Sequence, residues 1–164
     1  MTTARRPAAR RAVPPRERAL DDTLFFKLVR LVNLTARPFA EHIGRANRLT
    51  LTEWRAMIVL ASHPGIAAQE VVARTGLDKM SVSRAIASLE RHARVSRRED
   101  PNDKRRAHLT LTAAGRRVFE RIAESATARE AQLFANVSAA EQRQMNDTLD
   151  KLLAGLASED SKTE

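Results

Sequence analysis

Residues 68–111 read AQEVVARTGLDKMSVSRAIASLERHARVSRREDPNDKRRAHLTL, and this stretch decides the fold of the chain. A short helix is predicted over 68–74, and Gly76 suits the left-handed position that follows a helix end. Asp78 is a good N-cap for a second helix over about 79–92. Two helices joined by a turn of three or four residues form a helix-turn-helix unit.

The hydrophobic period changes after the second helix. Apolar and polar residues alternate over 107–111, as in a half-buried strand, and residues 95–98 can form the opposing strand. Between them, Asp100 and Pro101 are typical of the first two positions of a type I turn. A hairpin directly after a helix-turn-helix makes the unit winged.

Long helices are expected on both sides of this unit. They cover residues 24–46, about 53–62, about 113–136 and from Ser138 to about 156. The expected N-caps are Asp21 or Asp22, Thr50, Thr112 and Ser138, with Glu53 and Glu141 completing two capping boxes. Pro38 is expected to kink or split the first helix.

The predicted fold is mainly α with one small β-hairpin, in a single winged-helix domain over residues 20–157. Its DNA-binding lobe is placed at 50–111, its dimerisation helices at 20–48 and 112–157, and disordered segments at 1–19 and 158–164.

The charge is strongly basic, with 29 Lys and Arg against 20 Asp and Glu and a net charge of +9. Such an excess favours an acidic partner, usually nucleic acid or an anionic membrane surface. Residues 1–19 hold six Arg, one Glu and three Pro, so they cannot bury apolar area. This tail either tracks phosphates or an adjacent minor groove or is simply disordered. With five Phe, one Trp and no Tyr, a base-stacking platform for single-stranded RNA is disfavoured.

Several classes of protein are disfavoured by what the sequence lacks. The chain has no cysteine, and it shows no Gly-rich phosphate loop, Ser–His–Asp pattern or paired carboxylates in an apolar setting. We therefore expect no enzyme activity and no cofactor. The four histidines are scattered, so no metal site is expected. No apolar run approaches the ~18 residues of a membrane span, and the start lacks the apolar core of a secretory signal. A cytoplasmic protein is expected.

The helix predicted over 79–92 has one apolar face and one face suited to DNA. At about 100° per residue, the apolar stripe consists of Val82, Ile86, Leu89 and Ala93. The opposite side has small residues, serines and arginines, and no acid before Glu90. Arginine can bind guanine with two hydrogen bonds, and serine can bind a base edge or a phosphate. The expected DNA contacts are Lys79, Ser81, Ser83, Arg84, Ser88 and Arg91; a solvated amphipathic helix is the alternative.

The predicted hairpin tip, 97–106, carries four arginines and one lysine. A narrow minor groove focuses negative potential that attracts arginine. An acid beside an arginine fixes its rotamer, so less side-chain entropy is lost on binding. The expected wing contacts are Arg98, Asp103, Lys104, Arg105 and Arg106; a polar turn with self-compensating charges is the alternative.

A longer pattern runs through the wing into the next helix. It consists of Asp100, Pro101, Asp103, Lys104 and Arg105, then Leu111, Thr112 and Gly115, after LDKMSVSRAIASLE at 77–90. Over about residues 20–157 the chain resembles the MarR (multiple antibiotic resistance regulator) family of winged-helix repressors. The resemblance implies an obligate homodimer on an inverted-repeat operator. It also implies that Arg105 enters the minor groove, that Asp103 orients it, and that Ser81, Ser83 and Arg84 contact DNA. The Arg-rich tail and Pro38 depart from the family pattern, and the absence of cysteine excludes its thiol-based peroxide sensors.

The outer helices carry more apolar surface than a small winged domain needs. The residues are Leu24, Phe25, Leu28, Leu31, Val32, Val118, Phe119, Ile122, Leu133, Phe134, Val137, Met145, Leu149, Leu152, Leu153 and Leu156. We expect them to form a dimer interface, with an intramolecular core as the alternative.

The resemblance further implies release from DNA by a small molecule, often an aromatic anion, bound between the dimer helices and the DNA lobe. The residues expected to line that site are Arg37, His42, Arg45, Trp54 and His63, although Trp54 also suits a core position and the histidines suit structural or exposed ones. The sequence therefore predicts a dimeric repressor on double-stranded DNA. The alternative is a non-specific architectural or protein-interaction winged helix.

Overall fold

The computed structural model describes residues 19–99 and 107–160, so most of the predicted terminal tails and of the wing tip lies outside the described residues. In chain order the helices and strands are a 3-10 turn Leu20–Asp22, α1 Leu24–Pro38, a π-helical turn Phe39–Ile43, α2 Gly44–Asn47, α3 Leu51–Ser62, α4 Ala68–Thr75, α5 Lys79–Arg91, β1 Val95–Glu99, β2 Ala107–Leu111, α6 Ala113–Leu133 and α7 Ala139–Asp160. The prediction of a mainly α fold with one hairpin is confirmed.

Most helix starts follow the predicted capping chemistry. Thr50 Oγ1 accepts from the Glu53 amide at 3.2 Å, and the Glu53 carboxylate accepts from the Thr50 amide at 2.6 Å. The same reciprocal pair joins Ser138 and Glu141 before α7. Thr112 caps α6 by accepting from the amide of Gly115. These caps satisfy amides that have no partner inside the helix.

The first helix differs from the prediction in its cap. Asp21 and Asp22 belong to the 3-10 turn, and Thr23 is the N-cap, accepting from the Phe26 amide at 3.2 Å. Only Thr23 has the extended backbone that turns a side-chain oxygen toward the next turn's amides.

The expected interruption at Pro38 is confirmed, because the predicted helix 24–46 is divided there into α1, a π-helical turn and α2. After Pro38 the hydrogen bonding widens to a π-helical turn, in which the Gly44 amide donates to Phe39 O, and α2 then ends at Asn47. Three other bounds shift by a few residues. α3 begins at Leu51, α6 ends at Leu133, and α7 continues to Asp160, so residues 158–160 are helical where disorder was predicted.

The predicted DNA-binding lobe packs around one core shared by α3, α4, α5, the hairpin and one face of α6. Its fully buried side chains are Met57, Leu60, Val71, Val82, Ile86, Leu89, Leu109 and Ile122. The apolar stripe of α5 is confirmed at three of its four positions. Ala93 is exposed, because it lies beyond the end of α5 with a φ of 53°, and Ala85 is buried instead.

The hairpin is antiparallel, pairing Val95 with Leu111 and Glu99 with Ala107. Its second strand is held against the lobe by the loop before α4. The Gly65 amide donates to Leu109 O, and the Leu109 amide donates to Ile66 O, both at 2.9 Å. The base of the wing is thus fixed to the helix-turn-helix.

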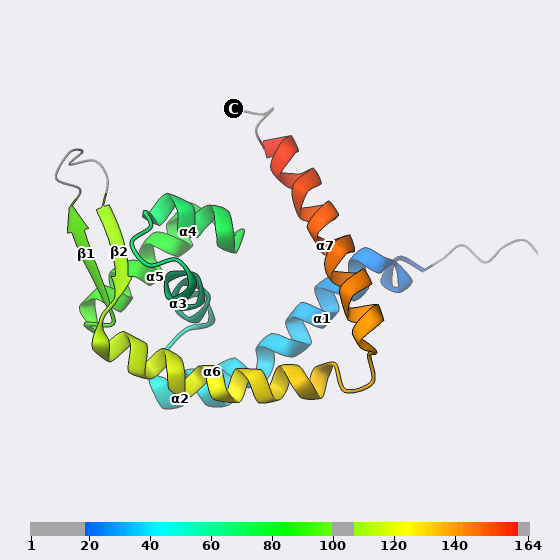
Figure 1. The fold of residues 1–164 in the computed structure, drawn as a ribbon, viewed down its shortest axis with the longest axis horizontal. Helices are drawn as coiled ribbons and strands as arrows, with labels where there is room; N and C mark the ends of the chain where they lie inside the picture. Colours follow the sequence, from blue (N-terminus) through cyan, green and yellow to red (C-terminus); the bar gives the residue numbers. More distant parts are fainter. Residues whose placement is uncertain (1–18, 100–106, 161–164) are drawn as a thin grey trace, which may run out of the picture.

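The outer helices leave the lobe. α6 runs from the hairpin to α7, and both α7 and the outer end of α1 lie away from the lobe (Figure 1). α1 buries no residue, and every described side chain of α7, over 139–158, is exposed in the single chain. Across the described residues, no helix is both long and apolar enough to cross a membrane.

Candidate DNA-binding site

The outer face of α5 presents the predicted DNA-reading side chains. Lys79, Ser83, Arg84 and Arg91 are exposed, and Ser81 is half-buried. They point away from the apolar stripe because that stripe faces α3 and α4. α5 contains no acid before its last turn, so its exposed face is cationic and polar.

The first turn of α5 holds two of these residues together. Asp78 Oδ1 accepts from the Ser81 amide at 2.8 Å, and the Arg84 guanidinium donates to Ser81 Oγ at 3.4 Å. Hydrogen bonds from Ser81 and the nearby charge of Arg84 hold the pKa of Asp78 below its usual value. Ser81 and Arg84 therefore form an adjacent pair in the N-terminal half of α5, the half that is expected to contact base edges.

Ser88 lies differently from the other predicted contacts. It faces Glu53 of α3 across a hollow of about 260 Å³ that Arg84 also lines. Burial of Glu53, which is 4% exposed, raises its pKa, but hydrogen bonds from Ser88 and Thr50 outweigh that effect and leave the pKa lowered. Ser88 thus joins α5 to α3 as well as bordering the outer face.

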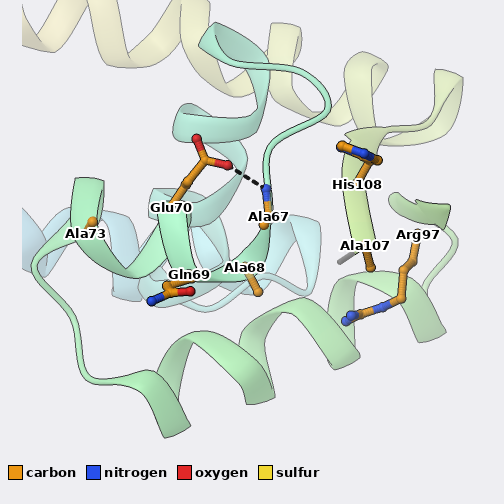
Figure 2. A pocket seen from close by; sticks show the side chains of 8 residues that line it. All are labelled: Ala67, Ala68, Gln69, Glu70, Ala73, Arg97, Ala107 and His108. Carbon is orange, nitrogen blue, oxygen red and sulfur yellow. Dashed lines mark hydrogen bonds between the residues drawn. The ribbon is translucent and has the colours of Figure 1, made fainter. Parts of the chain in front are cut away.

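A pair that the sequence analysis missed ties the wing to α5. Arg97 of β1 donates to both carboxylate oxygens of Glu90, at 2.8 and 3.3 Å. These hydrogen bonds raise the pKa of Arg97 above its usual value. Figure 2 shows Arg97 reaching from the hairpin across an open hollow of about 580 Å³, on whose other side lies α4 with Gln69. The only acid of α5 is therefore neutralised within the lobe.

The predicted wing contacts lie mostly outside the described residues, which end at Glu99 and resume at Ala107. Arg98 is exposed on β1, opposite His108 of β2. Asp103, Lys104, Arg105 and Arg106 lie within the undescribed segment, so their roles stay predictions.

The five residues predicted to bind an effector do not come together. Trp54 is buried between Phe39 and Phe119, with ring centroids 6.0 and 5.3 Å away. His63 lies at the C-cap of α3, where its Nε2 is 3.2 Å from the Arg74 guanidinium. Arg37, His42 and Arg45 are exposed.

A different hollow does lie between the lobe and the segment formed by α1, the π-helical turn and α2 (residues 24–47), which we call the arm. It measures about 220 Å³ and has Trp54 in its wall; the lining residues are Thr35, Phe39, Ile43, Leu51, Trp54, Ile122, Ala126, Arg129, Glu130 and Leu133. Arg129 and Glu130 are its charged residues, and the sequence analysis missed both. Among the residues that the structure describes, no three His, Asp or Glu side chains are grouped as metal ligands would be.

Comparison with known proteins places this architecture in a family. The MarR family model matches residues 49–106. An HTH-type transcriptional repressor of Mycobacterium tuberculosis is 26% identical over 132 residues, covering 80% of this chain and 95% of that protein. The structure of a MarR/EmrR family transcriptional regulator from Acinetobacter is similar with a TM-score of 0.78 and 27% identity, covering 85% and 99%. The fold is also shared by CouR of Rhodococcus jostii bound to p-coumaroyl-CoA, with a TM-score of 0.74 and 23% identity, covering 84% and 96%. The match over residues 49–106 and these similarities support a winged-helix transcriptional regulator of the MarR family.

Proposed function

We propose that this regulator is a homodimer that represses transcription from an inverted-repeat operator and leaves it when a small aromatic anion binds. The observation that carries the DNA-binding part is the exposed face of α5, where Ser81 and Arg84 are held together and Glu90 is already paired with Arg97. Such a face can enter a major groove without bringing an unpaired carboxylate toward phosphates.

The homodimer is supported by apolar side chains that the single chain leaves in solvent. The large ones on the arm and the end helices are Leu20, Leu24, Phe25, Phe26, Val29, Leu31, Val32, Leu34, Leu133, Met145, Leu149, Leu152, Leu153 and Leu156. So many large apolar side chains left exposed on the outer helices are typical of a protein–protein interface. A two-fold dimer would set two α5 helices about one DNA turn apart, roughly 34 Å.

The first experiment compares the DNA upstream of the protein's own coding sequence with scrambled DNA of equal length. Fluorescence anisotropy is measured between 50 and 200 mM salt. A repressor with a specific operator should prefer the upstream DNA by ~10³ or more. Equal and steeply salt-dependent binding to both would favour the architectural alternative or an operator elsewhere.

Arg84→Ala is expected to relax base preference at one position in each half-site by ~1–3 kcal/mol, because a base-reading arginine contributes mainly to discrimination. The measurement is the affinity of each variant for operators substituted one base pair at a time. Lys79→Ala is the comparison. Loss of a lysine that contacts phosphate should weaken binding to all DNA sequences alike and lower the salt slope by about 1. Uniform losses in Arg84→Ala would reassign Arg84 to phosphate positioning.

We propose that the effector binds in the hollow between the arm and the lobe. About 220 Å³ lined by Phe39 and Trp54 suits one aromatic ring, since an apolar cavity of ~150 Å³ admits benzene. Arg129 at its edge supplies a cation for a carboxylate. The fold neighbour bound to p-coumaroyl-CoA supports an aromatic acyl ligand.

Arg129→Ala is therefore expected to weaken the binding of benzoate and hydroxycinnamates about tenfold, the loss of one charge-assisted hydrogen bond. Quenching of Trp54, the only tryptophan, reports binding directly. Glu130→Gln is the control, and removing its negative charge should strengthen binding or leave it unchanged. Equal affinity in Arg129→Ala and the unaltered protein would place the anion elsewhere.

A further inference from the structure

The turn at Ala93 and Arg94 is where α5, the hairpin and α6 meet. The Arg94 amide donates to Leu89 O at 2.8 Å, and Arg94 O accepts from the Thr112 amide at 3.0 Å. The Thr112 hydroxyl donates to Ala93 O at 2.6 Å. The backbone of Arg94 is therefore fixed to the end of the recognition helix and to the start of α6.

The side chain of Arg94 reaches in the other direction, to a segment 46 and 47 residues earlier. Its Nη2 donates to Asn47 O at 2.6 Å, and its Nη1 donates to Arg48 O at 3.0 Å. These carbonyls lie at the end of α2, where the last helical carbonyls have no partner within the helix. Arg121 adds a longer hydrogen bond to the Asn47 side chain, at 3.4 Å.

The arm that ends at α2 has few other attachments to the lobe. α1 buries no residue, and the arm's described buried residues, Phe39, Gly44 and Leu49, all lie in or just after the π-helical turn and α2. The direction of α1 relative to α5 is therefore set within this short segment. A planar guanidinium on two consecutive carbonyls fixes both a distance and an orientation, which a single ammonium cannot do.

We propose that Arg94 is a positioning residue, which sets the angle between the dimerisation arm and the recognition helix and thereby the separation of the two recognition helices on DNA. This inference rests on the proposed homodimer. A merely structural role, as a cap on α2, would affect the melting temperature without changing that separation.

The separation can be measured directly, because the chain has no cysteine and one introduced thiol carries a unique label. Ala87 is exposed on α5, so Ala87→Cys with a nitroxide label reports the distance between the two recognition helices of a free dimer by pulsed electron resonance. The parent variant should give one narrow distribution near the ~34 Å of one DNA turn. Arg94→Ala in the same background should give a broader or shifted distribution.

Two further variants separate the guanidinium from its charge. Arg94→Lys keeps the charge and loses the two-carbonyl fork, so it should behave like Arg94→Ala. Arg117→Ala removes an equal charge from an exposed position of α6 and should leave the distribution unchanged. Unaltered distributions in a folded Arg94→Ala or Arg94→Lys protein would overturn the proposal. If Arg94→Ala fails to fold, the distance distribution of Arg94→Lys alone tests the proposal.

A binding experiment on cysteine-free chains gives the functional readout. Arg94→Ala should bind an isolated half-site within about twofold of the unaltered protein, because α5 is intact. It should bind the complete inverted repeat at least about tenfold more weakly, since a mobile lobe lowers the effective concentration at the second half-site. Equal losses on both DNAs would contradict a positioning role. If the labelled Ala87→Cys protein with Arg94 intact shows no dipolar coupling between two labels, the homodimer itself is refuted. That result is distinct from a dimer whose distance distribution does not respond to the Arg94 variants, which refutes only the Arg94 proposal.

Discussion

Leu153→Asp is expected to make the protein monomeric and to weaken its binding to a complete operator by about a hundredfold or more. Leu153 is 63% exposed in the single chain, so a charge there costs little in an isolated protomer. In the proposed two-fold dimer the same position would be covered, and two carboxylates would lose their hydration with an effective penalty of roughly several kcal/mol each. A monomer engages one half-site and loses the gain of the second.

Sedimentation and operator anisotropy on the same samples test this prediction. Ile58→Asp is the matched control, since Ile58 is also an exposed aliphatic residue but lies on α3 in the DNA lobe. It should stay dimeric. A dimeric Leu153→Asp protein would remove α7 from the interface. A monomer that binds the full operator as tightly as the unaltered protein would refute the need for two lobes.

The parts of the fold that could be predicted depend on interactions between residues that are close together in the chain. Thr50 with Glu53 and Ser138 with Glu141 satisfy helix amides three residues away, and the structure contains both pairs. As predicted, Asp78 is the N-cap of α5. Gly76 follows the end of α4, also as predicted, and adopts a φ of 64°. Such signals survive folding because their partners are neighbours in the chain.

The contacts that were missed depend on packing between different helices and strands. The Arg94 side chain donates to carbonyls 46 and 47 residues earlier in the chain, and Arg97 of β1 donates to Glu90 of α5. Each of these arginines looks, in sequence, like one more basic residue beside the wing. Only the three-dimensional positions of the hairpin and the arm show that Arg94 and Arg97 make hydrogen bonds within the protein, whereas Arg98 lies exposed on β1.

The residues predicted to line the effector site have different surroundings for a related reason. Charged and aromatic residues were chosen by type from the arm and the lobe, yet the π-helical turn after Pro38 determines which of them face inward. That turn buries Phe39 against Trp54 and leaves His42 and Arg45 in solvent. A change in helical register of this kind leaves no clear periodic signal in the sequence.

Gly115→Ala is expected to lower the free energy of unfolding by about 3 kcal/mol, the upper part of the usual range for an overpacked site. A methyl group at Gly115 would overlap the carbonyl oxygen of Arg94 and lie 2.8 Å from its carbonyl carbon. The obstacle is backbone, and that backbone is held by the Leu89 and Thr112 hydrogen bonds, so it cannot move without loosening the junction of α5, the hairpin and α6.

Urea unfolding followed by circular dichroism measures the loss, with Gly155→Ala as the matched control. Gly155 lies within α7 with nothing within 4 Å of its added methyl, so the same change should stabilise the helix by up to about 1 kcal/mol. Because Gly115 packs on the residue that holds the arm, a partly destabilised Gly115→Ala protein should also show the broadened recognition-helix separation expected of Arg94→Ala. Unchanged stability in Gly115→Ala would mean that the backbone at Arg94 can shift to accommodate the methyl group. The connection between the arm and the lobe would then be less rigid than its hydrogen bonds indicate.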